Sequence, residues 1–275
     1  MRCMSQVVKV QSKTQGWSNI IEGEPQCRTA YSTRISSAHR KSKPAMNFRH
    51  VFMSTRNTLV RLGRAIGFLW MYRKYRQFTM APRGQFLRNM VIVDSRRHVQ
   101  GCIVECGVWR GGMSAGMAQV MGPDREYFLF DSFEGLPPAT EADGAYAKTW
   151  QQDTEGDTYY DNCRAPIEFA ERAMRLSGAP HHKLVKGWFE NTLPEFVPPG
   201  PIAILRLDGD WYESTMIALE SLFKHLSPDG IVILDDYYAW DGCSRAVHDF
   251  LSRHQLAARV TQRYGICVIE PRQPA

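Results

Sequence analysis

The apolar positions after Gln100 change their spacing several times along the chain. Short runs rich in Val, Ile, Leu and Phe, typical of buried strands, alternate with segments whose apolar residues recur every three or four positions, as in amphipathic helices. This alternation predicts an α/β domain with a parallel sheet covered by helices on both faces. The predicted strands are 102–106, 127–130, 183–185, 202–207, 231–234, 258–262 and 266–270.

Helical spacing between these strands predicts four helices. Pro166 at the start of the second helix and Gly178 just after its end are typical helix boundaries. A sheet of this kind binds ligands beyond the carboxyl ends of its strands, so the residues that follow each strand are the candidates for function. The predicted helices are 114–121, 166–177, 214–226 and 243–256.

The first 99 residues differ from the rest of the chain. Residues 1–46 are rich in Ser, Thr, Lys and Arg and are predicted to be a disordered basic tail, while residues 47–99 are predicted to be helical, with a second helix over 85–98. The first helix is basic and amphipathic, so it either packs on the domain of residues 100–275 or across a dimer interface, or it binds a membrane surface or nucleic acid. Its apolar stripe is predicted at Leu59, Leu62, Ile66 and Leu69.

Charge is distributed unevenly along the chain. Residues 1–98 contain 19 Lys or Arg against three Asp or Glu, whereas residues 99–275 contain 15 against 25. The acidic part would repel phosphates, which argues against a nucleic-acid substrate. Seven cysteines without a CxxC pair, and the lack of a secretory signal, predict a cytoplasmic protein with reduced thiols. The apolar run of residues 65–72 is too short to span a membrane.

Two predicted strand ends have the features of a ribose-binding site. After the first strand, Gly107, Gly111 and Gly112 allow a tight turn and close approach of a ligand to the backbone. Their GxxxGG spacing differs from the GxGxxG of dinucleotide-binding proteins, which disfavours NAD. Asp131 follows the second strand and is placed to accept both hydroxyls of a ribose, although a helix N-cap is the alternative.

Two further strand ends carry carboxylates. Asp208 follows the fourth predicted strand, and Asp235 and Asp236 follow the fifth, which we expect to be its neighbour in the sheet. Crowded carboxylates repel one another unless a divalent cation with oxygen ligands lies between them. These three residues therefore predict a magnesium-type site. Asp210 and Glu213 are ambiguous, because acidic residues are also common in the first turn of a helix.

Five segments at or near the strand ends form an ordered set of motifs. They are Glu105-Cys-Gly-Val-Trp-Arg-Gly-Gly112, Asp131-Ser-Phe-Glu-Gly-Leu-Pro137, Gly187-Trp-Phe-Glu-Asn-Thr-Leu-Pro194, Leu205-Arg-Leu-Asp-Gly-Asp-Trp-Tyr-Glu-Ser-Thr215 and Ile233-Leu-Asp-Asp-Tyr237. Together they resemble the macrocin O-methyltransferase family over residues 77–270. The resemblance implies a Rossmann-like class I methyltransferase sheet, mostly parallel with an antiparallel last strand, and an N-terminal helical lid. It also implies S-adenosylmethionine and Mg²⁺ as cofactors, and a hydroxyl of a sugar or vicinal diol on a natural product as the methyl acceptor.

The resemblance implies roles for individual residues. Asp208, Asp235 and Asp236 match the family's metal ligands, and Asp208 also matches its proton acceptor, which makes it the predicted catalytic residue. Nine residues are implied to bind S-adenosylmethionine: Glu105, Gly107 and Val108 at the methionine part, Asp131 and Ser132 at the ribose, Gly187 and Trp188 at the adenine, and Thr79 and Met80 where the lid closes.

The segment 138–163, which is predicted to be a loop, departs from the family pattern. It combines four aromatic residues with six acidic ones and lacks the basic, His-containing stretch of macrolide-acting relatives, which disfavours a macrolide and leaves another hydroxyl-bearing small molecule as the acceptor. The resemblance further implies a homo-oligomer. The alternatives are an RNA or other macromolecule methyltransferase that uses the basic N-terminal region, a metal-dependent hydroxylase or hydrolase on a similar sheet, and a non-catalytic binding protein.

Overall fold

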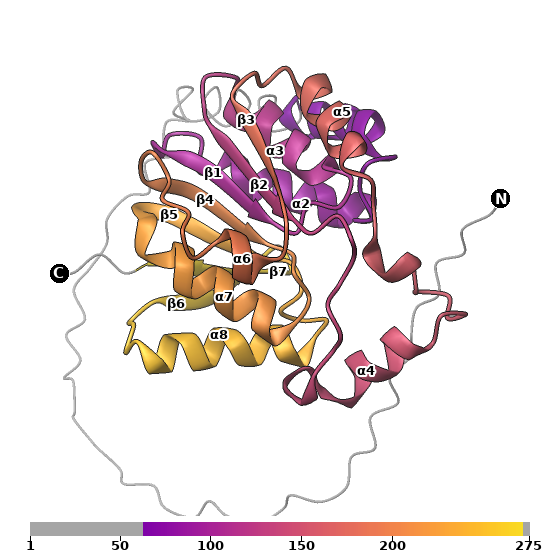
Figure 1. Ribbon diagram of the computed structural model, residues 1–275. Coiled ribbons are helices and arrows are strands. Elements are labelled where there is room, and N and C mark those ends of the chain that lie inside the picture. The colour runs from indigo at the N-terminus through magenta and orange to yellow at the C-terminus, as the bar shows by residue number, and fades with distance from the viewer. Residues whose placement is uncertain (1–62, 272–275) are drawn as a thin grey trace, which may run out of the picture. The chain divides into compact units, whose positions relative to one another are not determined.

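A seven-stranded sheet forms the centre of the computed structural model, which describes residues 63–271 (Figure 1). The strand order is β3-β2-β1-β4-β5-β7-β6, in which β1 to β5 are parallel and β7 is antiparallel to both β5 and β6. The predicted class of sheet is therefore confirmed. The strands are β1 (Cys102–Cys106), β2 (Tyr127–Asp131), β3 (His182–Lys186), β4 (Ile202–Leu207), β5 (Leu226–Leu234), β6 (Arg259–Arg263) and β7 (Ile266–Glu270).

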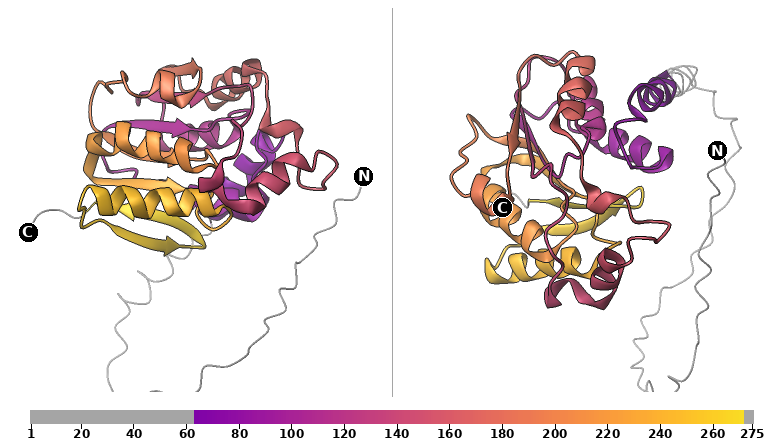
Figure 2. Two further views of the ribbon diagram at one scale, coloured as in Figure 1. Left: turned by 60° about the horizontal axis from the view of Figure 1, so that its bottom comes forward. Right: turned by 45° about the vertical axis from the view of Figure 1, so that its right-hand side comes forward.

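Helices cover both faces of the sheet (Figure 2). Because successive strand residues point to opposite faces, Ile103 lies in the apolar core on one side and Val104 in the core on the other. The first core contains buried residues of α2, α3 and α5, and the second contains those of α7 and α8. The helices are α2 (Arg83–Asp94), α3 (Gly112–Met121), α4 (Gly144–Gln152), α5 (Ile167–Ser177), α6 (Phe189–Thr192), α7 (Tyr212–Leu222) and α8 (Asp241–Arg253).

The strand order reverses between β1 and β4. From β1 the chain continues to β2 and β3 on one side, and from β4 to β5 on the other. Backbone hydrogen bonds continue past the strand ends, since the Asp208 N–H donates to the Cys106 carbonyl at 2.9 Å and the Asp235 N–H to the Leu207 carbonyl at 3.0 Å. A crevice for ligands opens at such a reversal. The residues that follow four of the strands therefore meet at one edge of the sheet.

The helix before α2 packs through a different face from the one predicted. Residues 63–75 are helical, and Ile66 and Leu69, predicted on the apolar stripe, are 47% and 38% exposed. Of the predicted partners of this stripe, the domain of the same chain does not bury it, and a dimer interface, a membrane surface or nucleic acid stay predictions. Apolar spacing alone does not tell which of two apolar faces of a helix meets the domain. The buried face consists of Phe68, Met71 and Tyr75.

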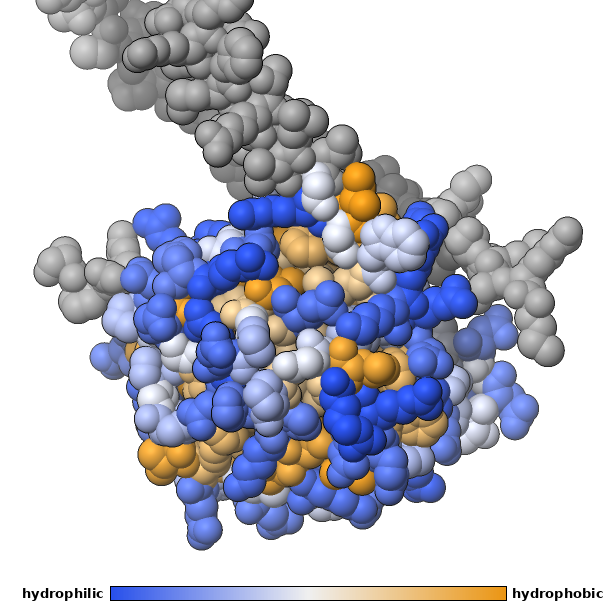
Figure 3. Space-filling view, turned by 90° about the horizontal axis from the view of Figure 1, so that it is seen from above, coloured by the Kyte–Doolittle hydropathy of each residue, from blue (hydrophilic) through white to orange (hydrophobic). Residues whose placement is uncertain are grey.

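Hydrophilic side chains cover most of the face seen in Figure 3, with apolar residues in small groups between them. Within residues 63–271, no helix is long and apolar enough to cross a membrane. The predicted tail of residues 1–46, together with Leu59 and Leu62, lies outside the described residues.

The segment 138–163, expected to be a loop, contains the short helix α4, which extends away from the sheet (Figure 1). Asp143 fastens this segment to the domain, because its buried carboxylate accepts hydrogen bonds from the Thr140 N–H at 2.7 Å and from the Tyr212 N–H at 2.6 Å. Tyr212 is the first residue of α7. One of the six acidic residues of the segment therefore has a structural role at a helix start.

Candidate active site

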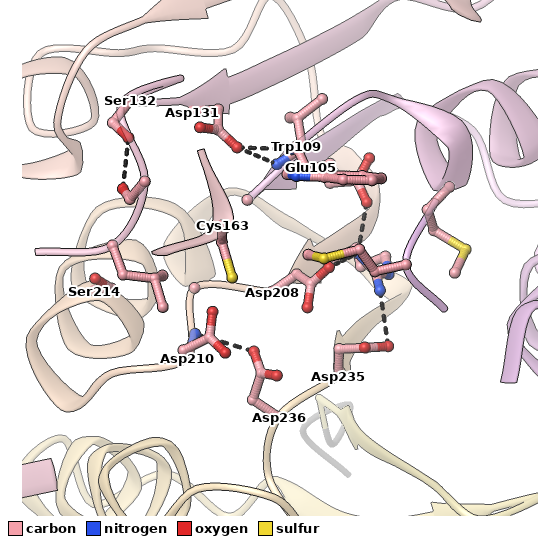
Figure 4. A pocket seen from close by; sticks show the side chains of 18 of the residues that line it. Glu105, Trp109, Asp131, Ser132, Cys163, Asp208, Asp210, Ser214, Asp235 and Asp236 are labelled. Atoms are coloured by element: carbon pink, nitrogen blue, oxygen red, sulfur yellow. Dashed lines mark hydrogen bonds and ion pairs between the residues drawn. The ribbon is translucent and has the colours of Figure 1, made fainter. Parts of the chain in front are cut away.

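A cavity of about 270 Å³ opens at the carboxyl ends of β1, β2, β4 and β5 (Figure 4). Gly187, one of the predicted site residues, is not part of its lining, although the Gly187 N–H donates to the Asp131 carbonyl at 2.9 Å. No histidine within residues 63–271 lines the cavity. The other predicted residues all do: Thr79, Met80, Glu105, Gly107, Val108, Asp131, Ser132, Trp188, Asp208, Asp235 and Asp236.

The Gly-rich turn between β1 and α3 has no room for a side chain at Gly107 or Gly112. A Cβ atom on Gly107, whose φ is +91°, would lie 1.8 Å from the Asp208 carbonyl oxygen. A Cβ atom on Gly112 would lie 2.5 Å from the Phe78 carbonyl oxygen, which accepts the Gly112 N–H at 2.8 Å. The two glycines therefore allow β1 to approach the tip of β4 and the segment before α2 to approach α3.

Asp131 ends β2 and is held by the backbone around it. Its Oδ2 accepts the N–H groups of Val108 and Trp109 at 2.7 and 2.8 Å, and its Oδ1 accepts the Phe133 N–H at 2.6 Å. Burial raises the pKa of this carboxyl, and the three N–H donors oppose that shift. Asp131 does not cap a helix; it joins the turns after β1 and β2 and presents a carboxylate to the cavity.

Glu105 lies within β1 and is 1% exposed. The Ser114 hydroxyl of α3 donates to its Oε2, and Arg206 Nη1 of β4 donates to its Oε1 at 2.6 Å. Burial raises the pKa of Glu105, while Arg206 and Ser114 oppose the shift. A buried carboxylate with these two partners is fixed in position at the cavity wall.

Asp208, Asp235 and Asp236 form the cluster that the sequence predicts. One carboxylate oxygen from each of the three lies within 4.8 Å of the others. The Asp210 N–H donates to Asp236 Oδ2 at 3.0 Å, and Asp210 also lines the cavity, whereas Glu213 is exposed outside it. Three hard oxygen donors at this separation fit a divalent cation such as Mg²⁺.

The cluster is electrostatically unfavourable by itself. Burial raises the pKa of Asp208 and Asp236, and neighbouring carboxylates raise both further, although Arg206 opposes the shift at Asp208. Burial also raises the pKa of Asp210 to about 7, against the hydrogen bond from the Trp240 indole N–H at 2.8 Å. Carboxylates in such surroundings favour a proton or a cation between them.

Two polar partners of the cluster were missed by the sequence reasoning. The buried Arg206 contacts Asp208 Oδ2 and Asp235 Oδ1 through its Nη1 and Nη2, at 2.8 Å in each case. The Gln85 amide of α2 donates to Asp235 Oδ2 at 2.6 Å. An arginine inside an otherwise apolar predicted strand is the signal that could have identified the first of these. Nothing in the local sequence distinguishes Gln85.

Aromatic side chains pack beside the carboxylates. Trp240, which donates to Asp210, lies 5.0 Å from Trp211 and 5.5 Å from Trp150 between ring centroids, with edge-to-face geometry in both pairs. The ring of Tyr146 in α4 lies 5.3 Å from that of Trp240 at a tilt of 31°, and Tyr146 is 66% exposed. The segment 138–163 is thus joined through Tyr146 and Trp150 to Trp240, the hydrogen-bond donor of Asp210.

A known protein family matches most of this chain. Residues 39–269 match the family model described as macrocin O-methyltransferase. The chain belongs to the macrocin O-methyltransferase family. The resemblance of the five sequence motifs is therefore confirmed, and this macrocin-type protein is an O-methyltransferase. Family membership argues against the alternatives of a hydroxylase, a hydrolase or a non-catalytic binding protein.

Individual relatives of this macrocin-type O-methyltransferase act on natural products. It is 36% identical over 187 residues to 8-demethyl-8-(2,3-dimethoxy-alpha-L-rhamnosyl)-tetracenomycin-C 4'-O-methyltransferase of Streptomyces olivaceus, covering 66% of this chain and 68% of that protein. It is 30% identical over 192 residues to mycinamicin III 3''-O-methyltransferase of Micromonospora griseorubida, covering 66% and 72%. The solved structure of the O-methyltransferase NovP aligns with a TM-score of 0.59 at 27% identity, covering 68% of this chain and 81% of that chain.

Proposed function

We propose that this protein transfers a methyl group from S-adenosylmethionine to a hydroxyl of a sugar, or of another vicinal diol, on a small-molecule natural product, and that it requires Mg²⁺. The observation that carries the proposal is the position of three clustered carboxylates, Asp208, Asp235 and Asp236, in the same cavity as Glu105 and Asp131. One part of the cavity thus fits a cationic organic cofactor, and the other part fits a metal ion.

The cofactor would occupy the part of the cavity near β1 and β2. Asp131 keeps lone pairs available beyond its three backbone hydrogen bonds, so it is suited to accept the ribose hydroxyls. Glu105 provides negative charge for the ammonium group of the methionine part, and Gly107 and Val108 line the wall beside it. Trp188 borders the position proposed for the adenine, and Ser132 lies next to Asp131.

The metal and the acceptor hydroxyl would lie at the tips of β4 and β5. When Mg²⁺ is bound to Asp208, Asp235 and Asp236, it supplies positive charge that lowers the pKa of a nearby hydroxyl. Asp208 Oδ2 accepts the Arg206 hydrogen bond, which leaves Oδ1 as the atom available to take the hydroxyl proton. The Asp208 side chain remains 35% exposed, so the acceptor has access to it.

The N-terminal helical region is proposed as the lid. Thr79 and Met80 lie between the helix of residues 63–75 and α2, and both line the cavity. Gln85 of α2 reaches the cluster through Asp235. Closure of this region over the cofactor would exclude water from the reacting atoms. We further propose a homo-oligomeric, cytoplasmic enzyme.

A labelling experiment tests the proposed reaction and the class of acceptor. The full-length chain is incubated with S-adenosylmethionine carrying an isotope-labelled methyl group, Mg²⁺ and a panel of glycosylated natural products with free sugar hydroxyls, and the products are analysed by mass spectrometry. We expect one labelled methyl on a sugar fragment. Label in added RNA, with none in any glycoside, would instead support the macromolecule methyltransferase.

A further inference from the structure

Arg206 occupies an unusual position in the middle of the sheet. It lies in β4, whose other residues are all apolar, and its side chain is 1% exposed. In the strand register it lies directly beside Glu105 of β1 on one side and Ile233 of β5 on the other. The guanidinium contacts three carboxylates, those of Glu105, Asp208 and Asp235, at 2.6, 2.8 and 2.8 Å.

These three carboxylates belong to different parts of the proposed site. Glu105 belongs to the cofactor part, whereas Asp208 and Asp235 belong to the metal part. A single nitrogen, Arg206 Nη1, donates to both Glu105 Oε1 and Asp208 Oδ2, and Nη2 pairs with Asp235 Oδ1. A planar guanidinium has its donors in fixed directions, so the three carboxylates are fixed relative to one another.

We propose that Arg206 is a positioning residue that sets the cofactor carboxylate and two metal carboxylates as one unit, so that each ligand binds to a site shaped in part by the other. This inference rests on the proposed function, because it takes Glu105 to face the cofactor and Asp208 and Asp235 to hold the metal.

Stability alone gives a weak reason for an arginine here. A buried network of charges loses its hydration, and well-packed apolar residues of similar volume often stabilise a fold as well or better. Arginine has only donors, so it cannot itself bind a cation or accept a proton from the substrate. Its effect on the reaction must therefore pass through the carboxylates that it holds.

Two neighbouring side chains provide matched controls, because each touches only one part of the site. The Ser114 hydroxyl donates to Glu105 Oε2, on the cofactor side. The Gln85 amide donates to Asp235 Oδ2 at 2.6 Å, on the metal side. Removal of either side chain should reduce the binding of a single ligand, whereas a change at Arg206 should reduce the binding of both.

Calorimetry with two separate probes tests the inference. S-adenosylhomocysteine is titrated into the full-length chain in EDTA, and MgCl₂ is titrated into the chelated and dialysed chain without cofactor. The variants are Arg206→Lys, which keeps the charge but loses the fork of donors, Ser114→Ala and Gln85→Leu. Circular dichroism and the melting temperature show whether each variant is folded.

We expect Arg206→Lys to lower the affinity for each of the two ligands by roughly tenfold, the effect of losing a charge-assisted hydrogen bond. Ser114→Ala should lower only the affinity for S-adenosylhomocysteine, and Gln85→Leu should lower only the affinity for Mg²⁺. A folded Arg206→Lys chain with both affinities within twofold of the wild type, or with only one of them reduced, overturns the inference. Failure of the wild-type chain to bind either probe overturns the proposed function instead, and the inference with it.

A second measurement needs no change at Arg206, so it decides the matter even if the lysine variant fails to fold. In the wild-type chain, saturating MgCl₂ should tighten S-adenosylhomocysteine binding by roughly fivefold, because carboxylates ordered by the metal also order Arg206 and Glu105. An affinity that is the same with and without MgCl₂ contradicts the proposed coupling.

Discussion

The two parts of the cavity differ in how far the chain itself satisfies their carboxylates. In the cofactor part, Asp131 accepts three backbone N–H groups and Glu105 has a hydroxyl and a guanidinium as partners. In the metal part, Asp208, Asp235 and Asp236 crowd together and share few donors. The first part therefore has more donors for each carboxylate than the second, and a bound cation would compensate for the shortage in the second. This difference is the basis for proposing the organic cofactor in the first part and the metal ion in the second.

The largest expected effect is the loss of methyl transfer on substitution of Asp208, which belongs to the metal part. Asp208→Asn should lower the rate of methyl transfer by about 10³-fold, because the variant loses a proton acceptor and a charged metal ligand. Its affinity for S-adenosylhomocysteine should remain within a few-fold of the wild type. The matched control is Glu213→Gln, the same chemical change at an exposed position outside the cavity, which should leave the rate unchanged. A large loss of cofactor affinity in Asp208→Asn would break the division into two parts.

A change at Asp131 should have the opposite signature. Asp131→Ala should weaken S-adenosylhomocysteine binding by roughly 10- to 100-fold, since hydrogen bonds to a charged group are lost. Mg²⁺ affinity, measured by calorimetry without cofactor, should change little. Asp124→Ala, an exposed carboxylate before the opposite end of β2, is the control. Equal losses for both ligands would show that Asp131 maintains the whole cavity rather than the ribose position.

The pH dependence of cofactor binding sharpens the same contrast. Because burial raises the pKa of Asp131 above its usual value, this carboxyl gains a proton at a higher pH than an exposed aspartate does. The ionised form is the better acceptor for ribose hydroxyls, so affinity should be constant above the raised pKa and fall as pH decreases through it. Calorimetry from pH 8 to pH 5 in EDTA measures this fall. Asp131→Asn should show a smaller fall, and an equal fall in both proteins would assign the titration to another group.

The smallest expected effect concerns the packing that joins α2, which reaches the metal part, to α3, which borders the cofactor part. A Cβ atom on Gly116 would lie 2.7 Å from Phe86 Cζ and 3.0 Å from Met90 Sδ. Gly116→Ala should therefore lower the free energy of unfolding by about 1–3 kcal/mol. Gly84→Ala, in α2 with its nearest neighbour at 3.6 Å, should raise it by about 0.5–1 kcal/mol. Thermal melts of both variants measure these changes. A Gly116→Ala protein more stable than the wild type would contradict the close packing of α2 against α3 at Gly116.

Strand positions were predicted well where apolar runs have sharp ends. The predicted ranges 102–106, 202–207 and 266–270 coincide with β1, β4 and β7. In contrast, α4 was missed. Only one of its residues, Ala147, is buried in the structure, so its sequence does not need the apolar stripe by which a helix is recognised. The face through which the helix of residues 63–75 packs on its own domain could not be predicted, because tertiary contacts, rather than spacing, select between its apolar faces.

The site shows the same division between local and long-range information. Asp208, Asp235 and Asp236 could be predicted to meet because each follows a strand, and the carboxyl ends of parallel strands share one edge of the sheet. The partnership of Arg206 with Glu105 joins residues 101 positions apart. It depends on the register between β1 and β4, which no single segment of the sequence contains.

The dependence of methyl transfer on Mg²⁺ tests the central claim most directly. The rate from labelled S-adenosylmethionine to a reactive acceptor is measured in EDTA and then across a titration of free Mg²⁺. We predict background activity in EDTA and a hyperbolic rise to full activity, with calorimetry giving one Mg²⁺ per chain and loss of that site in Asp235→Asn/Asp236→Asn. Full activity in EDTA would contradict the assignment of the carboxylate cluster as a metal site.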